Sequence, residues 1–402
     1  MRLFESLRHR PFALLWSGQT ISRLGDSLYR IALSWWVLEK TGSAAAMATV
    51  AFFSLAPMLV FLLIGGVLVD RLPRFRIMLI SDTVNTLVVG LVALLAHADR
   101  LEVWHIYAAS IVFGLAEAFF YPAYSASVPQ TVPPESLPSA NSLTNLSWQL
   151  SGIVGPSLGA IIVATGGTGT AFALDSLSFL IAAACLFPLR RVHPPAATAR
   201  PASPLADLRE GLATVLAAPF LWVSILVFAF INVTDAGPRN IALPFLIHDH
   251  LGLDVGALGL VASAFSLGSV GGAVVLGRMR RIRRRGPLAY GGIALGGLMI
   301  LCYGLAPSLP FLVGAAFVYG VAFSIAGLIW TNTLQSMVPP EKLGRVSSID
   351  ALGSFVLMPA GFALAGWLTD AIGPAQVFLL GGASTVGLAL LGFLHPAIRK
   401  LD

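Results

Sequence analysis

Long apolar runs constrain this chain of 402 residues more than any other feature. Each run is about 20 residues long and lacks the alternation of a strand, which is typical of a helix that crosses a lipid bilayer. Only 11% of the residues are charged, too few to cover a water-facing surface. The runs lie at 12–38, 44–69, 77–97, 103–125, 141–164, 171–189, 219–247, 255–277, 287–306, 309–331, 346–370 and 374–395. The sequence therefore predicts an all-α membrane protein with twelve transmembrane helices.

The basic residues predict the orientation of these helices. If the N-terminus is cytoplasmic, 20 of the 25 Lys and Arg fall on cytoplasmic segments, and only Lys40 and Arg100 face outside. This bias is the positive-inside rule. We interpret the basic run at 278–285 as a topology anchor on anionic membrane lipid, and we expect no binding of nucleic acid. The predicted location is the bacterial plasma (inner) membrane, with both termini in the cytoplasm.

An internal repeat divides the chain. "VPPESL" at 132–137 returns as "VPPEKL" at 338–343, and "IALSWWVLEKTG" at 31–42 resembles "IALPFLIHDHLG" at 241–252. The repeat predicts two pseudo-symmetric six-helix bundles of the same orientation, at 1–190 and 219–402. Between them, 191–218 reads as a cytoplasmic linker with a short amphipathic helix. Transporters use parallel repeats of this kind to place a binding site between the halves.

Polar residues follow one face of the first helix in each half. In the first half four polar residues follow one another at spacings of 4, 3 and 4 positions. In the second half three polar residues follow at spacings of 3 and 4, each 209 positions after its counterpart in the first half. Each set contains an Asp-x-x-x-Arg pair. A further acid, Glu117, falls within the fourth predicted helix. The two sets are Gln19, Arg23, Asp26 and Arg30, and Asn232, Asp235 and Arg239.

Two interpretations fit these buried charges. A charge at the bilayer centre costs at least ~2.5–3.5 kcal/mol, so it faces a cavity or a partner of opposite charge. The residues either line a functional cavity, with Asp26 the first candidate for the proton-binding group, or form ion pairs that only compensate one another. The Gly-Pro at 237–238 is expected to break the seventh helix beside Asp235, and a broken helix near buried charge favours a transport site. Asp82, Asp175 and Asp350 lie nearer to the predicted helix ends, where a capping or interfacial role fits at least as well as a place in the cavity.

Two further segments suggest moving parts. "GVLVDRLPRFR" at 66–76 ends the second helix with an acid where the helix dipole disfavours one, so it needs a cation or another helix start as partner. We predict a conformational latch there, formed by Gly66, Asp70, Arg71 and Arg74; an ordinary helix end with topology charges is the alternative. On the fifth helix, Gly152, Gly155, Pro156 and Gly159 predict either a hinge or a packing groove.

Several chemistries are excluded by the sequence. Only three lysines occur and none follows glycine, so a GxxxxGK[ST] phosphate loop is impossible and transport energy must come from a gradient. The seven histidines are scattered, and the two cysteines form neither a metal spacing nor a disulfide framework. We therefore expect no enzyme activity, no cofactor and no metal.

The twelve helices in two halves, the GxxxDRxxR segment at 66–74 and the GxxGPxxG of the fifth helix resemble the major facilitator superfamily over essentially the whole chain. Within it, "LWSGQTISRLGDSLYRIALSWWVLEKTGS" and "VPPESLPSANSL" look like the branch of macrolide-efflux pumps, the enterobactin exporter and lysophospholipid transporters. The resemblance implies alternating access and a central cavity lined by helices 1, 4, 7 and 10. It adds Tyr319 and Phe323 on helix 10 as apolar contacts, and it assigns Asp70 the latch and Gly155–Pro156 the antiporter motif.

The expected function is secondary active transport: proton-coupled efflux of amphipathic, drug-like compounds. The alternative within the same fold is an exporter or flippase of a specific anionic natural substrate, a siderophore or a lysophospholipid, which arginines in both halves would suit. A membrane enzyme or scramblase is the third class. The expected partners are a small-molecule substrate, protons and membrane lipid, with the chain acting as a monomer.

Overall fold

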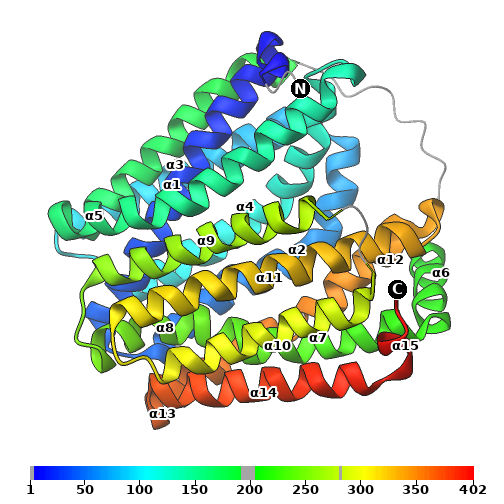
Figure 1. The fold of residues 1–402 in the computed structure, drawn as a ribbon. Coiled ribbons are helices and arrows are strands. Elements are labelled where there is room, and N and C mark those ends of the chain that lie inside the picture. Colours follow the sequence, from blue (N-terminus) through cyan, green and yellow to red (C-terminus); the bar gives the residue numbers. More distant parts are fainter. Residues whose placement is uncertain (1–3, 192–203, 280–282) are drawn as a thin grey trace. The chain divides into compact units, whose positions relative to one another are not determined.

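The computed structural model describes residues 4–191, 204–279 and 283–402; the side chains of 62–71, 204–208 and 340 lie outside the description. Across the described ranges the backbone forms helices joined by short turns and no strand (Figure 1). The prediction of an all-α chain is confirmed. The residues cluster into two compact units, of which the first comprises Met1–Thr198 with Asp254–Ser263, and the second Ala199–Leu253 with Ala264–Asp402.

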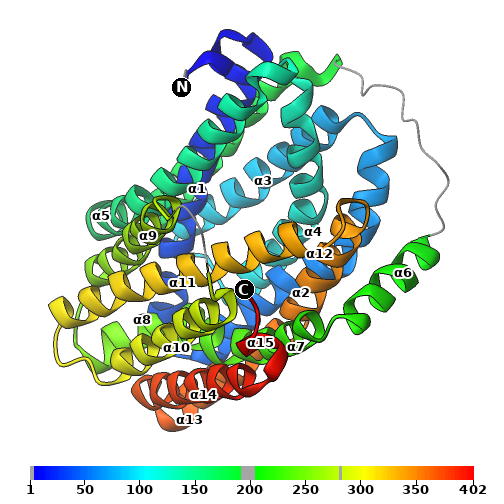
Figure 2. The same cartoon turned by 45° about the vertical axis from the view of Figure 1, so that its right-hand side comes forward.

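Five long helices build the first unit: α1 (Arg10–Thr41), α2 (Ala44–Arg71), α3 (Arg74–His97), α4 (Val103–Ser127) and α5 (Leu137–Leu186). Short 3₁₀ turns flank them at Glu5–Arg8, Val128–Gln130, Pro134–Ser136 and Phe187–Arg191. Local sequence sets the ends of α1: Pro11 lies in its first turn, where its missing N–H costs no hydrogen bond, and Gly42 ends it with φ 59°. α1 lies along α5 in both views (Figure 1, Figure 2).

The helix α5 is too long for one membrane crossing. Its 50 residues at 1.5 Å each would span roughly 75 Å, against a hydrocarbon core of about 30 Å. Gly167 interrupts it with φ 78° and ψ 167°, a conformation open to glycine because it has no Cβ. α5 therefore contains the two crossings predicted at 141–164 and 171–189. The break at Gly167 lies inside the gap predicted between these two spans, although the connection is only this one residue long.

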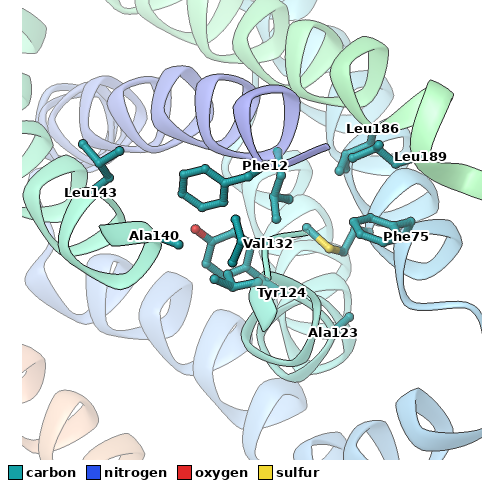
Figure 3. Close-up of a cluster of buried hydrophobic side chains, with 12 residues drawn as sticks. Phe12, Phe75, Ala123, Tyr124, Val132, Ala140, Leu143, Leu186 and Leu189 are labelled. Atoms are coloured by element: carbon teal, nitrogen blue, oxygen red, sulfur yellow. The ribbon is translucent and has the colours of Figure 1, made fainter. Parts of the chain in front are cut away.

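A cluster of buried side chains holds one end of the first unit together. Phe12 of α1, Phe75 of α3, Tyr124 of α4 and Leu143 of α5 meet in it (Figure 3). The indole Nε1 of Trp16 also donates to the Leu143 carbonyl at 3.2 Å. Close packing of side chains holds membrane helices together, so this cluster fixes the helix ends from which the polar face of α1 extends.

The second unit continues with α6 (Pro204–Ala217) and α7 (Pro219–Gly237), then the π-helical turns η5 (Pro238–Ala242) and η6 (Leu246–His250) on either side of α8 (Leu243–Phe245). It then holds part of α9 (Val255–Gly277), followed by α10 (Arg285–Gly304), α11 (Leu309–Met337), α12 (Pro340–Phe355), α13 (Met358–Ile372), α14 (Pro374–Leu394) and α15 (Pro396–Arg399). α10 lies along α14 in both views (Figure 1, Figure 2).

The break predicted in the seventh span is wrong, because Gly237 and Pro238 both keep helical φ and ψ and the segment Pro219–His250 stays helical; a bend there stays a prediction. α7 ends at Gly237, and a π-helical turn begins at Pro238. Gly237 is also where α7 crosses α13, because a Cβ there would lie 2.8 Å from the Gly361 carbonyl oxygen. An unpredicted interruption separates α12 from α13 at Val356 and Leu357, inside the span expected at 346–370.

The linker helix belongs to the second unit. The amphipathic helix predicted within 191–218 is α6, and it packs on α12 through Val215 and Val346. Glu210 of α6 binds Arg345 of α12 at 2.5 Å and Lys342 at 3.5 Å. The predicted limits of the linker stay a prediction, since residues 192–203 lie outside the description.

Among the described residues, ten helical segments are long and apolar enough to cross a membrane. One of them, Pro134–Arg191, contains both crossings of α5, and α1 is not among the ten because its polar face lowers its hydropathy. These two features account for the difference from the twelve predicted spans. The chain is a multi-pass helical membrane protein.

Candidate functional site

The polar face of α1 borders a small cavity in the first unit. Gln19, Arg23 and Asp26 line it from α1, and Glu117 lines it from α4, as the helical spacing predicted. The cavity has a volume of about 50 Å³. The structure thus brings four of the predicted residues to one place, and it adds others from α3 and α5 that the α1 pattern does not reveal: Asp82, Asn85 and Trp148.

Asp82 is the acid of this cavity that sequence reasoning placed wrongly. The sequence placed Asp82 near the start of the predicted span at 77–97, where a capping or interfacial role was expected. In the structure Asp82 is buried in α3, and its Oδ2 accepts a hydrogen bond of 3.1 Å from Gln19 Nε2. The signal available in the sequence was the pair Asp82 and Asn85, one turn apart within the span predicted at 77–97.

Aromatic rings hold the guanidinium of Arg23. Its Cζ lies 4.8 Å from the ring centre of Tyr124 and 4.2 Å from that of Trp148. Such cation–π contacts stabilise a charge by roughly 0.5–2 kcal/mol each, more where water is excluded. Arg23 is therefore stabilised without a carboxylate partner among the described residues.

Asp26 differs from what its sequence pattern suggested. The Asp-x-x-x-Arg spacing allowed an ion pair with Arg30, yet no ion pair of Asp26 forms among the described residues. Its Oδ1 is buried and accepts no hydrogen bond there. Arg30 is exposed and donates to Ser27 Oγ at 3.1 Å instead. Asp26 and Arg30 thus form no direct ion pair among the described residues, and both interpretations, cavity lining and mutual charge compensation, stay open for Asp26.

A second, larger cavity lies within the second unit. Its volume is about 280 Å³, and Asn232, Asp235, Tyr319 and Phe323 line it. All four were predicted, the last two through the family resemblance. Trp330 of α11 and Asp350 of α12 also line it and were not predicted as site residues.

In this second cavity the predicted ion pair does form. Arg239 Nη2 lies 3.4 Å from Asp235 Oδ2, one helical turn away. The Tyr319 hydroxyl lies 2.7 Å from each carboxylate oxygen of Asp235 and donates to them. Tyr319 was expected to be an apolar contact; it is instead a hydrogen-bond donor, because α11 brings its hydroxyl against the acid of α7.

Aromatic rings surround Arg239 as they surround Arg23. Its Cζ lies 5.4 Å, 5.3 Å and 5.9 Å from the ring centres of Phe265, Tyr319 and Phe323. Arg239 belongs to the π-helical turn that begins at Pro238, so its guanidinium lies one turn after Asp235 on a continuous helix. The ion pair and the rings together satisfy this charge.

The glycines predicted as a hinge lie in a helix contact. A Cβ on Gly155 would meet Ser27 Oγ at 2.9 Å, and one on Gly159 would meet the Leu28 backbone at 3.1 Å. α5 stays helical through Gly152 and Pro156. Small residues therefore let α5 approach α1 closely beside Asp26, as the packing-groove alternative expects. A hinge function stays a prediction.

The predicted latch lies almost entirely beyond the described side chains. Gly66, Asp70 and Arg71 fall in 62–71. Arg74 is described: its Nη1 donates to the Ala126 carbonyl at 3.0 Å, which joins α3 to α4. The latch stays a prediction.

The arrangement is that of a membrane carrier: two helical units, each with an internal cavity bordered by a charged residue on its first membrane-crossing helix. The chain belongs to the Major Facilitator Superfamily, whose sequence profile matches residues 15–349 and 228–400. The fold and recognition predictions are confirmed.

Relatives of known function cover nearly the whole chain. It is 26% identical to macrolide efflux protein A of Streptococcus pyogenes over 403 residues, 97% of each chain. It is 28% identical to the multidrug efflux pump Tap of Mycolicibacterium fortuitum, over 98% of this chain and 97% of the relative. It is 26% identical to the enterobactin exporter EntS of Shigella boydii, over 96% and 91%.

Solved structures share the fold at low identity. The nucleoside transporter NupG superposes with a TM-score of 0.76 at 12% identity, over 100% of both chains. A bacterial homologue of the iron transporter ferroportin, in an inward-facing state, gives 0.71 at 15% identity, over 96% of this chain and 99% of the other.

Proposed function

We propose that this protein is a proton-coupled exporter of amphipathic, drug-like compounds that works by alternating access. Relatives that cover nearly its whole length include a macrolide efflux protein and a multidrug efflux pump. The proposed location is the bacterial inner membrane with both termini cytoplasmic, as supported by the distribution of Lys and Arg. In this proposal the chain is a monomeric carrier in lipid and catalyses no reaction.

The observation that carries the coupling is the charge balance of the first cavity. Asp26, Asp82 and Glu117 line it, and Arg23 is the only basic residue among its lining. An excess of carboxylates away from bulk water is the chemistry required of a group that gains and loses protons during transport. Asp26 fits best, because its Oδ1 is buried and lacks a hydrogen bond, whereas Asp82 is engaged by Gln19.

A proteoliposome assay tests the coupling. Purified protein is reconstituted, a pH gradient is imposed, and uptake of a cationic dye is followed. We expect Asp26→Asn to abolish gradient-driven uptake while exchange of dye without a gradient continues. Glu135→Gln is the matched control, because Glu135 is an exposed acid in a turn outside the cavity. Full gradient-driven transport by both Asp26→Asn and Asp235→Asn would refute the proposed coupling.

A specific anionic natural substrate is the second candidate. Its support is the similarity to the enterobactin exporter, which matches the chain nearly as well as the drug pumps do. The arginines that suggested it are less available than the sequence implied, because Arg239 is paired with Asp235 and Arg23 is enclosed by two rings. The same liposomes, offered a siderophore and a lysophospholipid beside the dye, distinguish the two candidates by which compound accumulates.

A further inference from the structure

One buried acid of the first unit has no part in the coupling proposed above. Asp175 lies on α5 after the break at Gly167, and none of its surface is exposed, so it differs from the capping or interfacial residue that the sequence suggested. Its Oδ1 accepts a hydrogen bond of 3.3 Å from Ser178 Oγ, and its Oδ2 is buried with no hydrogen-bond partner in the described chain. No described basic residue forms an ion pair with it. An ionised carboxylate at this position would therefore lack both water and a counter-ion.

A glycine lets Asp175 reach α1 directly beside Asp26. α5 lies along α1 (Figure 1), and a Cβ on Gly25 would lie 2.6 Å from Asp175 Oδ1 and would also overlap Ser178 Oγ. Gly25 is followed at once by Asp26, and consecutive Cα atoms are about 3.8 Å apart. The contact of the two helices therefore brings both acids to the same level of the first unit. Asp26 is half-buried and lines the small cavity, whereas Asp175 lies outside the lining.

Aromatic side chains enclose Asp175 along α5. Phe172, about one turn before it, packs on Tyr29 of α1 with ring centres 5.3 Å apart. Phe179, about one turn after it, is buried and belongs to the wall of the small cavity. Since these rings separate Asp175 from the cavity, the acid that lies between it and water is Asp26.

The neighbouring charges favour a single proton on the two acids. In the described chain the charged and titratable groups that act on Asp175 are Asp26, Tyr29 and Arg30, all on α1. Arg30 is exposed and donates to Ser27 Oγ, so water screens its charge. Two ionised carboxylates in one site repel each other, and a proton on either one removes the repulsion. Carboxyl groups that interact in this way lose their protons as a pair.

We propose that Asp26 and Asp175 share one proton, so that Asp175 is a second proton-binding residue of the first unit. The inference rests on the proposed proton coupling and adds a residue to it. When the proton moves, the O–H bond of one carboxyl group breaks as the O–H bond of the other forms, and the pair keeps one proton and one negative charge. With the proton on Asp175, Asp26 is ionised at the cavity; with the proton on Asp26, it lies where the cavity receives it.

Infrared spectroscopy of the protein in lipid, with neither substrate nor gradient, tests the pair. Aspartate labelled with carbon-13 in its carboxyl group distinguishes the C=O band of a protonated aspartic acid from that of a glutamic acid. We expect a band at pH 7 that is lost in Asp175→Asn. In Asp26→Asn this band should disappear at a pH lower by about one unit or more, because the like charge is gone.

Two further variants complete the test. Ser178→Ala removes a donor to the ionised form of Asp175, so the same band should persist to higher pH. Asp99→Asn is the matched control, because Asp99 is an exposed aspartate in a turn and its left-handed backbone suits asparagine. It should leave the band and its titration unchanged.

Three results would overturn the proposal. The first is the absence of any band that is lost in Asp175→Asn or shifted in Ser178→Ala; the shift assigns the band if Asp175→Asn does not fold. The second is a band that persists at every pH at which the protein stays folded, which would make Asp175 a permanently neutral acid. The third is the same titration midpoint in Asp26→Asn and wild type.

The spectra require no transport, so this test and the test of export fail separately. A shared proton in a protein that moves no dye along a pH gradient would support the pair and contradict the proposed export. Gradient-driven uptake of dye, together with an unchanged midpoint in Asp26→Asn, would support export and overturn the pair.

Discussion

The same substitution at two equivalent positions should have different effects on stability. Asp26 and Asp235 correspond in the internal repeat, but among the described residues only Asp235 has direct partners: Arg239 at 3.4 Å and the Tyr319 hydroxyl at 2.7 Å. Asp235→Asn keeps an acceptor for Tyr319 and leaves the Arg239 charge uncompensated, with its Nε already lacking a hydrogen bond. Asp26→Asn removes a charge that has no direct ion-pair partner among the described residues.

The magnitudes follow from these contacts. Removing one partner of a buried ion pair costs roughly 3–5 kcal/mol. The Arg239 side chain is 22% exposed and keeps its three aromatic neighbours, so we expect about 3 kcal/mol for Asp235→Asn. Asp26→Asn replaces an unsatisfied carboxylate by a neutral amide and should change stability by less than about 1 kcal/mol, or increase it.

The assay is reversible unfolding in mixed micelles with increasing sodium dodecyl sulfate at pH 7. The double variant Asp235→Asn with Arg239→Gln is the internal control, because removing both charges should restore at least half of the lost free energy of unfolding. Equal losses in Asp26→Asn and Asp235→Asn, or a double variant less stable than Asp235→Asn, would refute the reasoning.

Three further outcomes are expected. Gly155→Ala should destabilise the protein by roughly 1–3 kcal/mol, because the added methyl group meets α1, whereas Gly291→Ala, with open space around it, should not; equal unfolding midpoints would contradict this. Glu210→Gln should lower stability by no more than about 1 kcal/mol, and only at low salt, because its two ion pairs are partly exposed; a loss that persists in high salt would show a non-ionic cause. Trp148→Leu should cost roughly 0.5–2 kcal/mol by removing one ring from Arg23, measured against Trp104→Leu, a tryptophan of similar exposure with no cation–π contact among the described residues; equal effects of the two changes would exclude the cation–π contribution.

Much of the architecture was predictable from local patterns. Runs of apolar residues predicted the spans, and the gap predicted between 164 and 171 contains the break at Gly167. What the local pattern did not show is the backbone conformation at such points. Gly167 leaves the helical conformation, whereas Gly237 and Pro238 keep it, and a glycine or proline in an apolar run does not show by itself which conformation it adopts.

The sequence by itself determined which polar residues share a helical face. The helical period places Gln19, Arg23 and Asp26 together, whatever surrounds them. Only the tertiary structure decided their partners, since these come from helices distant in the chain: Tyr319 reaches Asp235 across 84 positions, and Gln19 reaches Asp82 across 63. Spacing within one helix contains no information about which neighbour packs on it. For that reason two matching aspartates, one paired and one without a direct partner, look alike in the sequence and differ in the folded protein.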